Sequence, residues 1–305
     1  MTDTFGPCEI CGTCDWHIAY RGDVRDGIFG RSRPDAEVGH CGGCGADRLD
    51  ERVCPDDVFY ETEAYRKKLQ EELTTEGHYA VADELQVFTH QVMWPDSLRG
   101  KTIADIGCAG GSFLDHVSGL AKQCVAVEPC SVYHDSLRER GYRVFSYAND
   151  AVGESLAGQI DLAVSIQVIE HVGNPRAFLE EIRPLLAEDG KLIISTPNRN
   201  DILMELLPAD FRPFFYRAVH RWYFDAASLT ECARKAGFEV LETRFVHRYG
   251  MANALAWLRD LRPTGRRRIE SISPLADEMW CSYLEEAGKT DCIYMTLRPF
   301  KDERV

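Results

Sequence analysis

The chain has 305 residues, of which 45% are hydrophobic and 28% are charged, so it is long enough to bury a sizeable core. Its formal net charge of −14 argues against a polyanion as the main partner, because nucleic acid affinity rests largely on Lys and Arg side chains that neutralise phosphates. No apolar run approaches the roughly 18 residues of a membrane span, and residues 1–10 lack the basic and then apolar pattern of a secretory signal. We therefore expect a cytoplasmic protein that binds neither nucleic acid nor membrane.

The first segment, residues 1–56, contains two cysteine pairs that repeat one pattern. Cys8 and Cys11 precede a glycine, and so do Cys41 and Cys44. In a C-x-x-C-G knuckle both thiolates point at one ion while the glycine takes the turn. Two knuckles complete a tetrahedral Cys₄ site, which predicts a structural zinc (Zn²⁺) in a short β-ribbon, with no open position for substrate.

Other cysteines and histidines near the knuckles remain as spare ligands. They are Cys14, His17, His40 and Cys54. Free thiols or a redox pair are the alternative to a metal, although twelve cysteines in a cytosolic chain of this size favour metal binding. Acidic residues accompany the arginines between the knuckles, so the ribbon offers no net basic face for nucleic acid.

Residues 57–98 are expected to form a helical linker or lid. An apolar stripe at helical spacing ends before Pro95 and comprises Val81, Leu85, Phe88 and Val92. Tyr60, Tyr65 and Tyr79 are either core residues or part of a cover over a ligand.

Residues 99–305 alternate predicted strands with predicted helices. Such a pattern predicts an α/β domain with a parallel sheet and a ligand at the carboxyl ends of the strands. The strands are expected at residues 101–106, 123–128, 142–146, 160–167, 191–196, 239–247 and 292–298, and the helices at 112–120, 132–140, 175–186 and 227–236.

The turn after the first of these strands has the form D-x-G-x-x-G, with Asp105, Gly107 and Gly110. A dinucleotide fingerprint requires glycine at the first position. A carboxylate there would repel a pyrophosphate and attract an ammonium or sulfonium. Glu128 ends the next strand, where an acid can accept hydrogen bonds from both hydroxyls of a ribose.

These two features together resemble motif I and the second-strand acid of the class I S-adenosylmethionine (SAM) methyltransferases. The resemblance implies a doubly wound, seven-stranded, Rossmann-like sheet after the zinc ribbon, with the last two strands as an antiparallel pair at its edge. Glu170-His171-Val172 with Pro175 resembles the E-H-V-x-x-P signature of the ubiquinone-type enzymes, and residues 195–198 also match that group. The ribbon resembles the zinc-binding region of bacterial methyltransferases of secondary metabolite and surface glycan pathways, where it helps to frame the substrate site.

The resemblance assigns a set of residues to SAM. They are Asp105, Gly107, Cys108, Gly110, Glu128, Pro129, Asn149, Asp150 and Gln167. Asn149 and Asp150 stand where the family contacts the adenine amino group, and a helix N-cap is the other interpretation of Asp150.

Methyl transfer to a hydroxyl requires a base, for which His171 and His220 are the predicted candidates. Glu170-His171 also resembles a divalent metal site, here Mg²⁺, of the small-RNA 2′-O-methyltransferases, although Gln167 replaces an acidic ligand. A capping or packing role is the third interpretation of His171.

Two insertions interrupt the methyltransferase domain. Residues 198–225 are rich in aromatic side chains, which predicts a lid or binding wall. Residues 248–290 contain predicted helices at 251–261 and 275–287. They also carry Arg262, Arg266, Arg267 and Arg268, which form either a solvated loop or a clamp for a phosphorylated substrate.

The sequence therefore predicts a SAM-dependent methyltransferase. We expect it to act on a small molecule, a hydroxyl of a sugar nucleotide, glycan precursor or secondary metabolite. The alternatives are a macromolecular methyltransferase, acting on RNA or protein, and a SAM-fold scaffold whose zinc ribbon binds a partner.

Overall fold

The computed structural model describes residues 5–56, 58–70, 74, 77, 79, 98–263, 265 and 269–300. The predicted stripe of Val81, Leu85, Phe88 and Val92 lies outside these residues, and so do Arg266, Arg267 and Arg268. In the described part of the chain, no helix has both the length and the apolar character needed to cross a membrane.

The chain forms two compact units, each built from three segments. The sheet unit comprises Asp56–Ser195, Cys232–Glu242 and Met295–Val305, and the ribbon unit comprises Met1–Pro55, Thr196–Glu231 and Thr243–Tyr294. The ribbon unit therefore combines the predicted zinc ribbon with both predicted insertions.

The main sheet has seven strands in the order β10-β11-β8-β7-β4-β5-β6. β4 pairs in parallel with both β5 and β7, and all five of its residues are buried, which explains its continuous apolar sequence. Because the chain runs outward from β4 in both directions, the sheet is doubly wound as predicted, with a switch point beside β4. The strands are β4 (Thr102–Ile106), β5 (Gln123–Val127), β6 (Arg143–Phe145), β7 (Ile160–Ile166), β8 (Leu186–Pro197), β10 (Phe238–Val246) and β11 (Cys292–Pro299).

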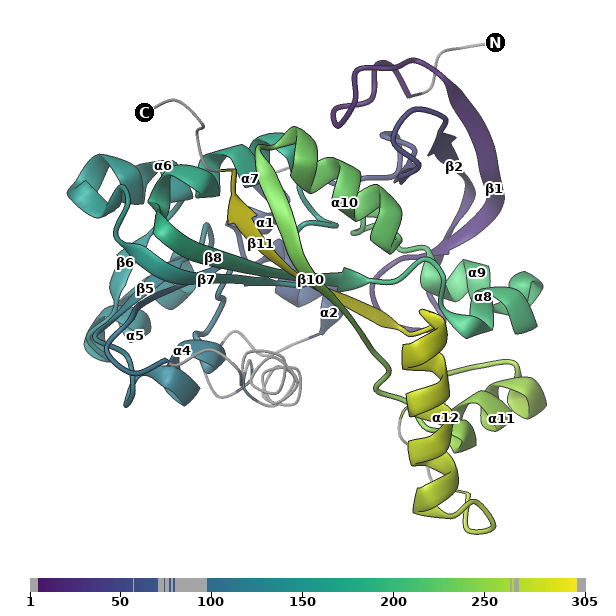
Figure 1. Cartoon of the computed structure of the whole chain (residues 1–305). Helices are drawn as coiled ribbons and strands as arrows, with labels where there is room; N and C mark the ends of the chain where they lie inside the picture. Colours follow the sequence, from purple (N-terminus) through teal and green to yellow (C-terminus); the bar gives the residue numbers. More distant parts are fainter. Residues whose placement is uncertain are drawn as a thin grey trace. The chain divides into compact units, whose positions relative to one another are not determined.

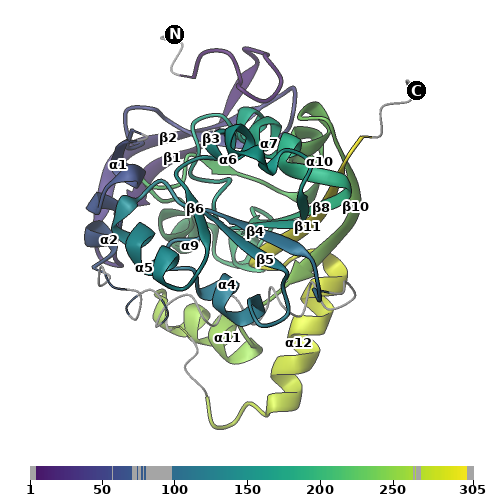
Figure 2. The same cartoon turned by 90° about the vertical axis from the view of Figure 1, so that its left-hand side faces the viewer.

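Helices cover both faces of this sheet. α4 (Ser112–Val117) and α5 (His134–Glu139) lie on one face, and α6 (Ala148–Ala151) and α7 (Pro175–Ile182) lie on the other (Figures 1 and 2). The other short helical segments of the sheet unit are α1 (Val58–Glu61), α2 (Ala64–Leu69), η1 (Ser131–Tyr133), η2 (Val152–Leu156) and η3 (Arg183–Leu185). α10 (Ala226–Lys235) leads from the ribbon unit into the sheet unit along the chain.

The helix predicted at 175–186 is shorter than expected. Asn174 caps α7 by accepting a hydrogen bond from the Ala177 N–H at 2.9 Å, and the α-helix ends at Ile182. Pro184 lacks an N–H and clashes with the preceding turn, so the chain continues as η3. β8 consequently begins at Leu186, before the predicted residue 191.

The ribbon unit has an antiparallel sheet of its own, in the order β1-β2-β3-β9. β1 (Trp16–Arg25) and β2 (Ser32–Cys41) form the expected ribbon, drawn in purple in Figure 1, and β3 is Asp47–Leu49. β9 (Trp222–Tyr223) comes from the first insertion. The helices of this unit are α8 (Ile202–Leu206), α9 (Pro208–Phe215), α11 (Met251–Asp260) and α12 (Pro274–Ala287).

The prediction that residues 198–225 form an aromatic lid or wall is wrong for most of its rings. Trp222, Tyr223 and Phe224 are fully buried, and Phe211 is 4% exposed. A ribbon of this size cannot bury enough apolar surface by itself, so the insertions complete its core. That core consists of Val24, Ala36, Val38, Leu49, Val53, Leu203, Phe211, Phe215, Tyr216, Ala218, Tyr223, Ala254 and Trp257.

Candidate functional site

The loop between β4 and α4 has a shape that requires glycine at two positions. Gly107 and Gly111 have φ values of +81° and +80°. A Cβ atom on Gly107 would lie 2.6 Å from Val168 Cγ2, and one on Gly111 would lie 2.5 Å from Leu137 Cδ2. The motif predicted close approach of SAM at Gly107 and Gly110, which stays a prediction. The structure adds Gly111, which the spacing alone did not single out.

Glu128, which directly follows β5, accepts hydrogen bonds from the backbone of this loop and of its own turn. Its Oε2 accepts a hydrogen bond from the Ala109 N–H at 2.7 Å, and its Oε1 accepts one from the Cys130 N–H at 2.8 Å. An ionised carboxylate has about four acceptor positions, so both oxygens keep the capacity to accept ribose hydroxyls. The sequence did not reveal the amides of Ala109 and Cys130, because backbone groups carry no residue signature.

Two buried carboxyl groups thus lie at the ends of the neighbouring strands β4 and β5. Burial, together with the charge of Glu128, raises the pKa of Asp105 to about 8. Burial also raises the pKa of Glu128, against the opposing effect of the two loop amides and of Arg66. A cationic ligand group would favour the ionised form of Asp105. Arg66, from α2, supplies a positive charge near Glu128 that the sequence did not indicate.

The remaining predicted SAM residues differ in exposure. Cys108 is 4% exposed, Pro129 is partly buried, and Asn149 and Asp150 are exposed. Asp150 Oδ2 accepts a hydrogen bond from the Tyr147 N–H at 3.0 Å. Tyr147 is the N-cap of α6, so Asp150 is the third helical residue of a capping box and the N-cap interpretation is wrong. The adenine contact stays a prediction.

Gln167 follows β7 in a strained conformation. Its φ of +57° is uncommon for a residue with a side chain. The Gln167 N–H donates to the Ser195 carbonyl at 3.0 Å, and Nε2 lies 3.3 Å from Ser195 Oγ. These contacts join the ends of β7 and β8, the edge where a doubly wound sheet binds its ligand, and such strain concentrates at functional sites.

His171 is held by two aromatic rings. Its ring makes T-shaped contacts with Tyr60 and Tyr65, at centroid distances of 5.4 and 5.5 Å. Glu170 is 1% exposed, and its Oε1 lies 4.0 Å from His171 Nε2. The structure therefore brings α1 and α2 to His171, a contact that the sequence left open between a cover and a core role.

His220 belongs to the ribbon unit and lies between α9 and β9. It is 5% exposed, and its Nε2 lies 3.2 Å from Arg217 Nη1. Because a guanidinium can only donate hydrogen bonds, Nε2 accepts in this contact and carries no proton.

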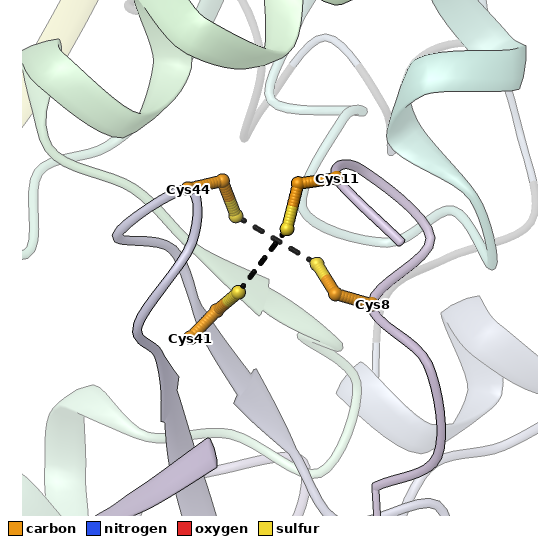
Figure 3. Close-up of side chains that lie close together, drawn as sticks. All are labelled: Cys8, Cys11, Cys41 and Cys44. Carbon is orange, nitrogen blue, oxygen red and sulfur yellow. Dashed lines mark hydrogen bonds between the residues drawn. The ribbon is translucent and has the colours of Figure 1, made fainter. Parts of the chain in front are cut away.

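The four predicted zinc ligands converge in the ribbon unit (Figure 3). The Sγ atoms of Cys8 and Cys44 are 3.7 Å apart, and those of Cys11 and Cys41 are 3.5 Å apart. A disulfide would require about 2.05 Å, whereas a tetrahedral zinc with Zn–S distances of about 2.3 Å places its sulfurs about 3.8 Å apart. The donor set and its spacing fit zinc.

The two knuckles have matching backbones. The Gly12 N–H donates to the Cys8 carbonyl at 2.7 Å, and the Gly45 N–H donates to the Cys41 carbonyl at 2.9 Å. Gly12 and Gly45 have φ values of +79° and +77°. Among the described residues, the spare candidates lie apart from this cluster. Cys14 is exposed, Cys54 Sγ lies 3.9 Å from the Leu49 carbonyl, and His40 Nδ1 pairs with Asp47 at 2.8 Å.

Comparison with known proteins places these features in a family. The family model described as a methyltransferase domain matches residues 65–243. The ubiquinone biosynthesis O-methyltransferase of Cereibacter sphaeroides is 27% identical over 185 residues, which cover 56% of this chain and 71% of that protein. The enzyme of the same name from Nitrosococcus oceani is 28% identical over 163 residues, covering 50% and 69%. A crystal structure of a SAM-dependent methyltransferase from Archaeoglobus fulgidus aligns with a TM-score of 0.48 at 15% identity, over 73% of this chain and 96% of that one.

Proposed function

Since the chain belongs to the methyltransferase domain family and is a SAM-dependent methyltransferase, we propose that it methylates a hydroxyl group of a small molecule. The similarity to two enzymes named ubiquinone biosynthesis O-methyltransferases supports both the oxygen nucleophile and the small acceptor. Sugar nucleotides, glycan precursors and secondary metabolites, the last including phenols, are the acceptor classes that we propose to test.

The observation that carries this proposal is the pair of buried carboxyl groups around the glycine loop. Glu128 would hold the ribose of SAM and Asp105 would attract its cationic part, while Gly107 packs against Val168 and gives the loop its positive φ. Asn149, Asp150 and Gln167 remain the proposed partners of its other parts. When bound, SAM supplies an electrophilic methyl group on a positively charged sulfur.

His171 is the proposed general base. Tyr60 and Tyr65 restrict the rotation of its ring, and the nearby carboxyl group of Glu170 would stabilise an imidazolium. His220 is the second candidate, because its Nε2 lone pair is already engaged by Arg217. A Mg²⁺ ion held by Glu170 and His171 is the alternative use of this pair.

We also propose that Cys8, Cys11, Cys41 and Cys44 bind one zinc ion. Four thiolates close the coordination sphere, so this ion would stabilise the ribbon and take no part in methyl transfer. Elemental analysis of the purified protein, compared with the Cys41→Ser variant, tests the ligand set.

Calorimetric titration with SAM tests the cofactor site. We expect Glu128→Ala to weaken binding by about 1.5 to 3 kcal/mol, the range for hydrogen bonds to a charged group. Glu139→Ala is the matched control, because Glu139 is an exposed carboxylate on α5 of the same unit. Unchanged affinity in a folded Glu128→Ala variant would overturn the assignment.

Transfer of a labelled methyl group from SAM tests the acceptor. A panel of sugar nucleotides, phenols, RNA and protein should yield a methylated product from the small molecules. Labelling confined to RNA or protein would favour the macromolecular alternative, and SAM binding without transfer to any class would favour a scaffold.

A further inference from the structure

Arg140, at the end of α5, makes a direct contact with the backbone of the glycine loop. Its Nη2 donates a hydrogen bond to the Gly110 carbonyl at 2.7 Å. Its Nε donates to the Ser136 carbonyl at 3.0 Å, which fixes the guanidinium against its own helix. A Cβ atom on Gly111 would lie 3.3 Å from Arg140 Nη1, so the guanidinium also lies against the last glycine of the loop.

The second arm of the guanidinium reaches Asp115, in the helix that follows the loop. Arg140 Nη1 lies 2.6 Å from Asp115 Oδ2, and both side chains are partly buried, at 23% and 30% exposure. The Tyr142 hydroxyl donates to the other oxygen of Asp115. One guanidinium thus holds the loop at its Gly110 carbonyl and at the first turn of α4.

Tyr79 belongs to the same network. Its hydroxyl donates to Asp115 Oδ2 and accepts a hydrogen bond from Arg140 Nη1 at 2.7 Å. The sequence left Tyr79 open between a core role and a cover over the ligand. Here it contacts the residues that hold the loop.

We propose that Arg140 is a positioning residue for SAM. This role rests on the proposed SAM site. Arg140 fixes the Gly110 carbonyl and, through Asp115, the start of α4, so that the loop amides are already placed when SAM arrives. Tyr79 supports this arrangement through its hydroxyl, which contacts both Asp115 and Arg140. Binding to a preformed loop avoids the ordering cost that a loosened loop would pay.

The test compares variants of the whole 305-residue chain by calorimetric titration with SAM. Arg140→Met removes all the donors and keeps most of the aliphatic stem, and we expect it to weaken SAM binding about tenfold. Arg138→Met is the matched control on the same helix, because Arg138 is 55% exposed and pairs with Asp135, whose side chain is 94% exposed. It should bind SAM as the wild type does.

Two further variants separate positioning from a stabilising ion pair. Arg140→Lys keeps a cation beside Asp115 but cannot also reach the Gly110 carbonyl, since a lysine lacks the planar fork. It should recover the melting temperature and leave SAM affinity reduced. Tyr79→Phe should weaken SAM binding about threefold, and this effect should disappear when Arg140 is already Met. These variants keep the test informative if Arg140→Met does not fold.

SAM affinity within twofold of the wild type in Arg140→Met, or full recovery of affinity in Arg140→Lys, would overturn the role. An equal loss in Arg138→Met would do the same. If the wild type itself does not bind SAM, the proposed function fails, and this role fails with it.

Discussion

Asp105 shows how a buried carboxyl group links pH to stability. Its pKa is raised from 3.8 to about 8, so the folded protein holds this proton more tightly than the unfolded chain does. The free energy of unfolding therefore falls as the pH rises from about 4 to about 8. In this range the unfolded chain has released the proton and the folded protein still holds it. Above pH 8 the folded protein contains the charged group and the cost is complete.

Asp105→Asn cannot ionise and should escape this cost. We expect its melting temperature, measured without SAM, to exceed that of the wild type by several degrees at pH 9. The difference should shrink as the pH is lowered to 5. SAM, which brings positive charge, should stabilise the wild type more than the variant at pH 9. If the melting temperatures of the two proteins change with pH in the same way, Asp105 is not the group that links pH to stability.

His171 should affect turnover far more than cofactor binding. A general base typically contributes about 10² to 10⁴ in rate, so His171→Ala should lower turnover by at least about tenfold and leave SAM affinity nearly unchanged. Once an acceptor is found, single-turnover kinetics and SAM titration measure the two effects separately. Activity that requires added Mg²⁺ or Mn²⁺, and that Glu170→Ala abolishes, would instead support the metal alternative.

At the scale of an element, the second zinc knuckle leaves no room for a side chain at Gly43. A Cβ atom there would lie 2.9 Å from the Cys11 Sγ and 2.8 Å from the Thr13 Cγ2. Gly43→Ala should therefore displace the Cys11 sulfur and weaken zinc binding by about tenfold, because a tetrahedral zinc needs each sulfur at about 2.3 Å. Competition with a chromophoric chelator measures this loss. Cys14→Ala, which alters an exposed thiol outside the cluster, should bind zinc normally.

Segments far apart in sequence belong to the same unit of the molecule because their side chains share one core. Side chains from β1 and β2 share a buried cluster with Phe211 of α9 and Trp257 of α11, although these lie far apart in sequence. From its sequence, the ribbon is expected to unfold alone when zinc is removed. Because the core is shared, we predict that both insertions lose packing when the proposed zinc is removed.

Chelation should therefore loosen more than the first 55 or so residues. Hydrogen exchange after treatment with a zinc chelator should show lost protection in β1 and β2 and also in α9 and α11. β4, β5 and β7 should keep their protection, because their core belongs to the sheet unit. Loss confined to residues 5–56 would show that the insertions are stable without the ribbon.

The sequence by itself determined the parallel strands of the sheet, the acids at the ends of β4 and β5, and the four cysteines that converge in the ribbon unit. Each of these follows from local spacing, since strand periodicity, a glycine turn and a C-x-x-C knuckle are set within a few residues. For the same reason, the predicted bounds of α11 and α12 are close to the observed ones. α7 is shorter than predicted because Pro184 cannot continue an α-helix.

Only the tertiary structure decided which distant side chains meet. No local pattern indicates that Tyr60 and Tyr65 contact His171, or that Arg140 binds the Gly110 carbonyl. The buried aromatic residues of the first insertion have the same composition as a binding wall. Whether such rings face a ligand or a core depends on the apolar surface that other segments bring to them, and packing alone sets that.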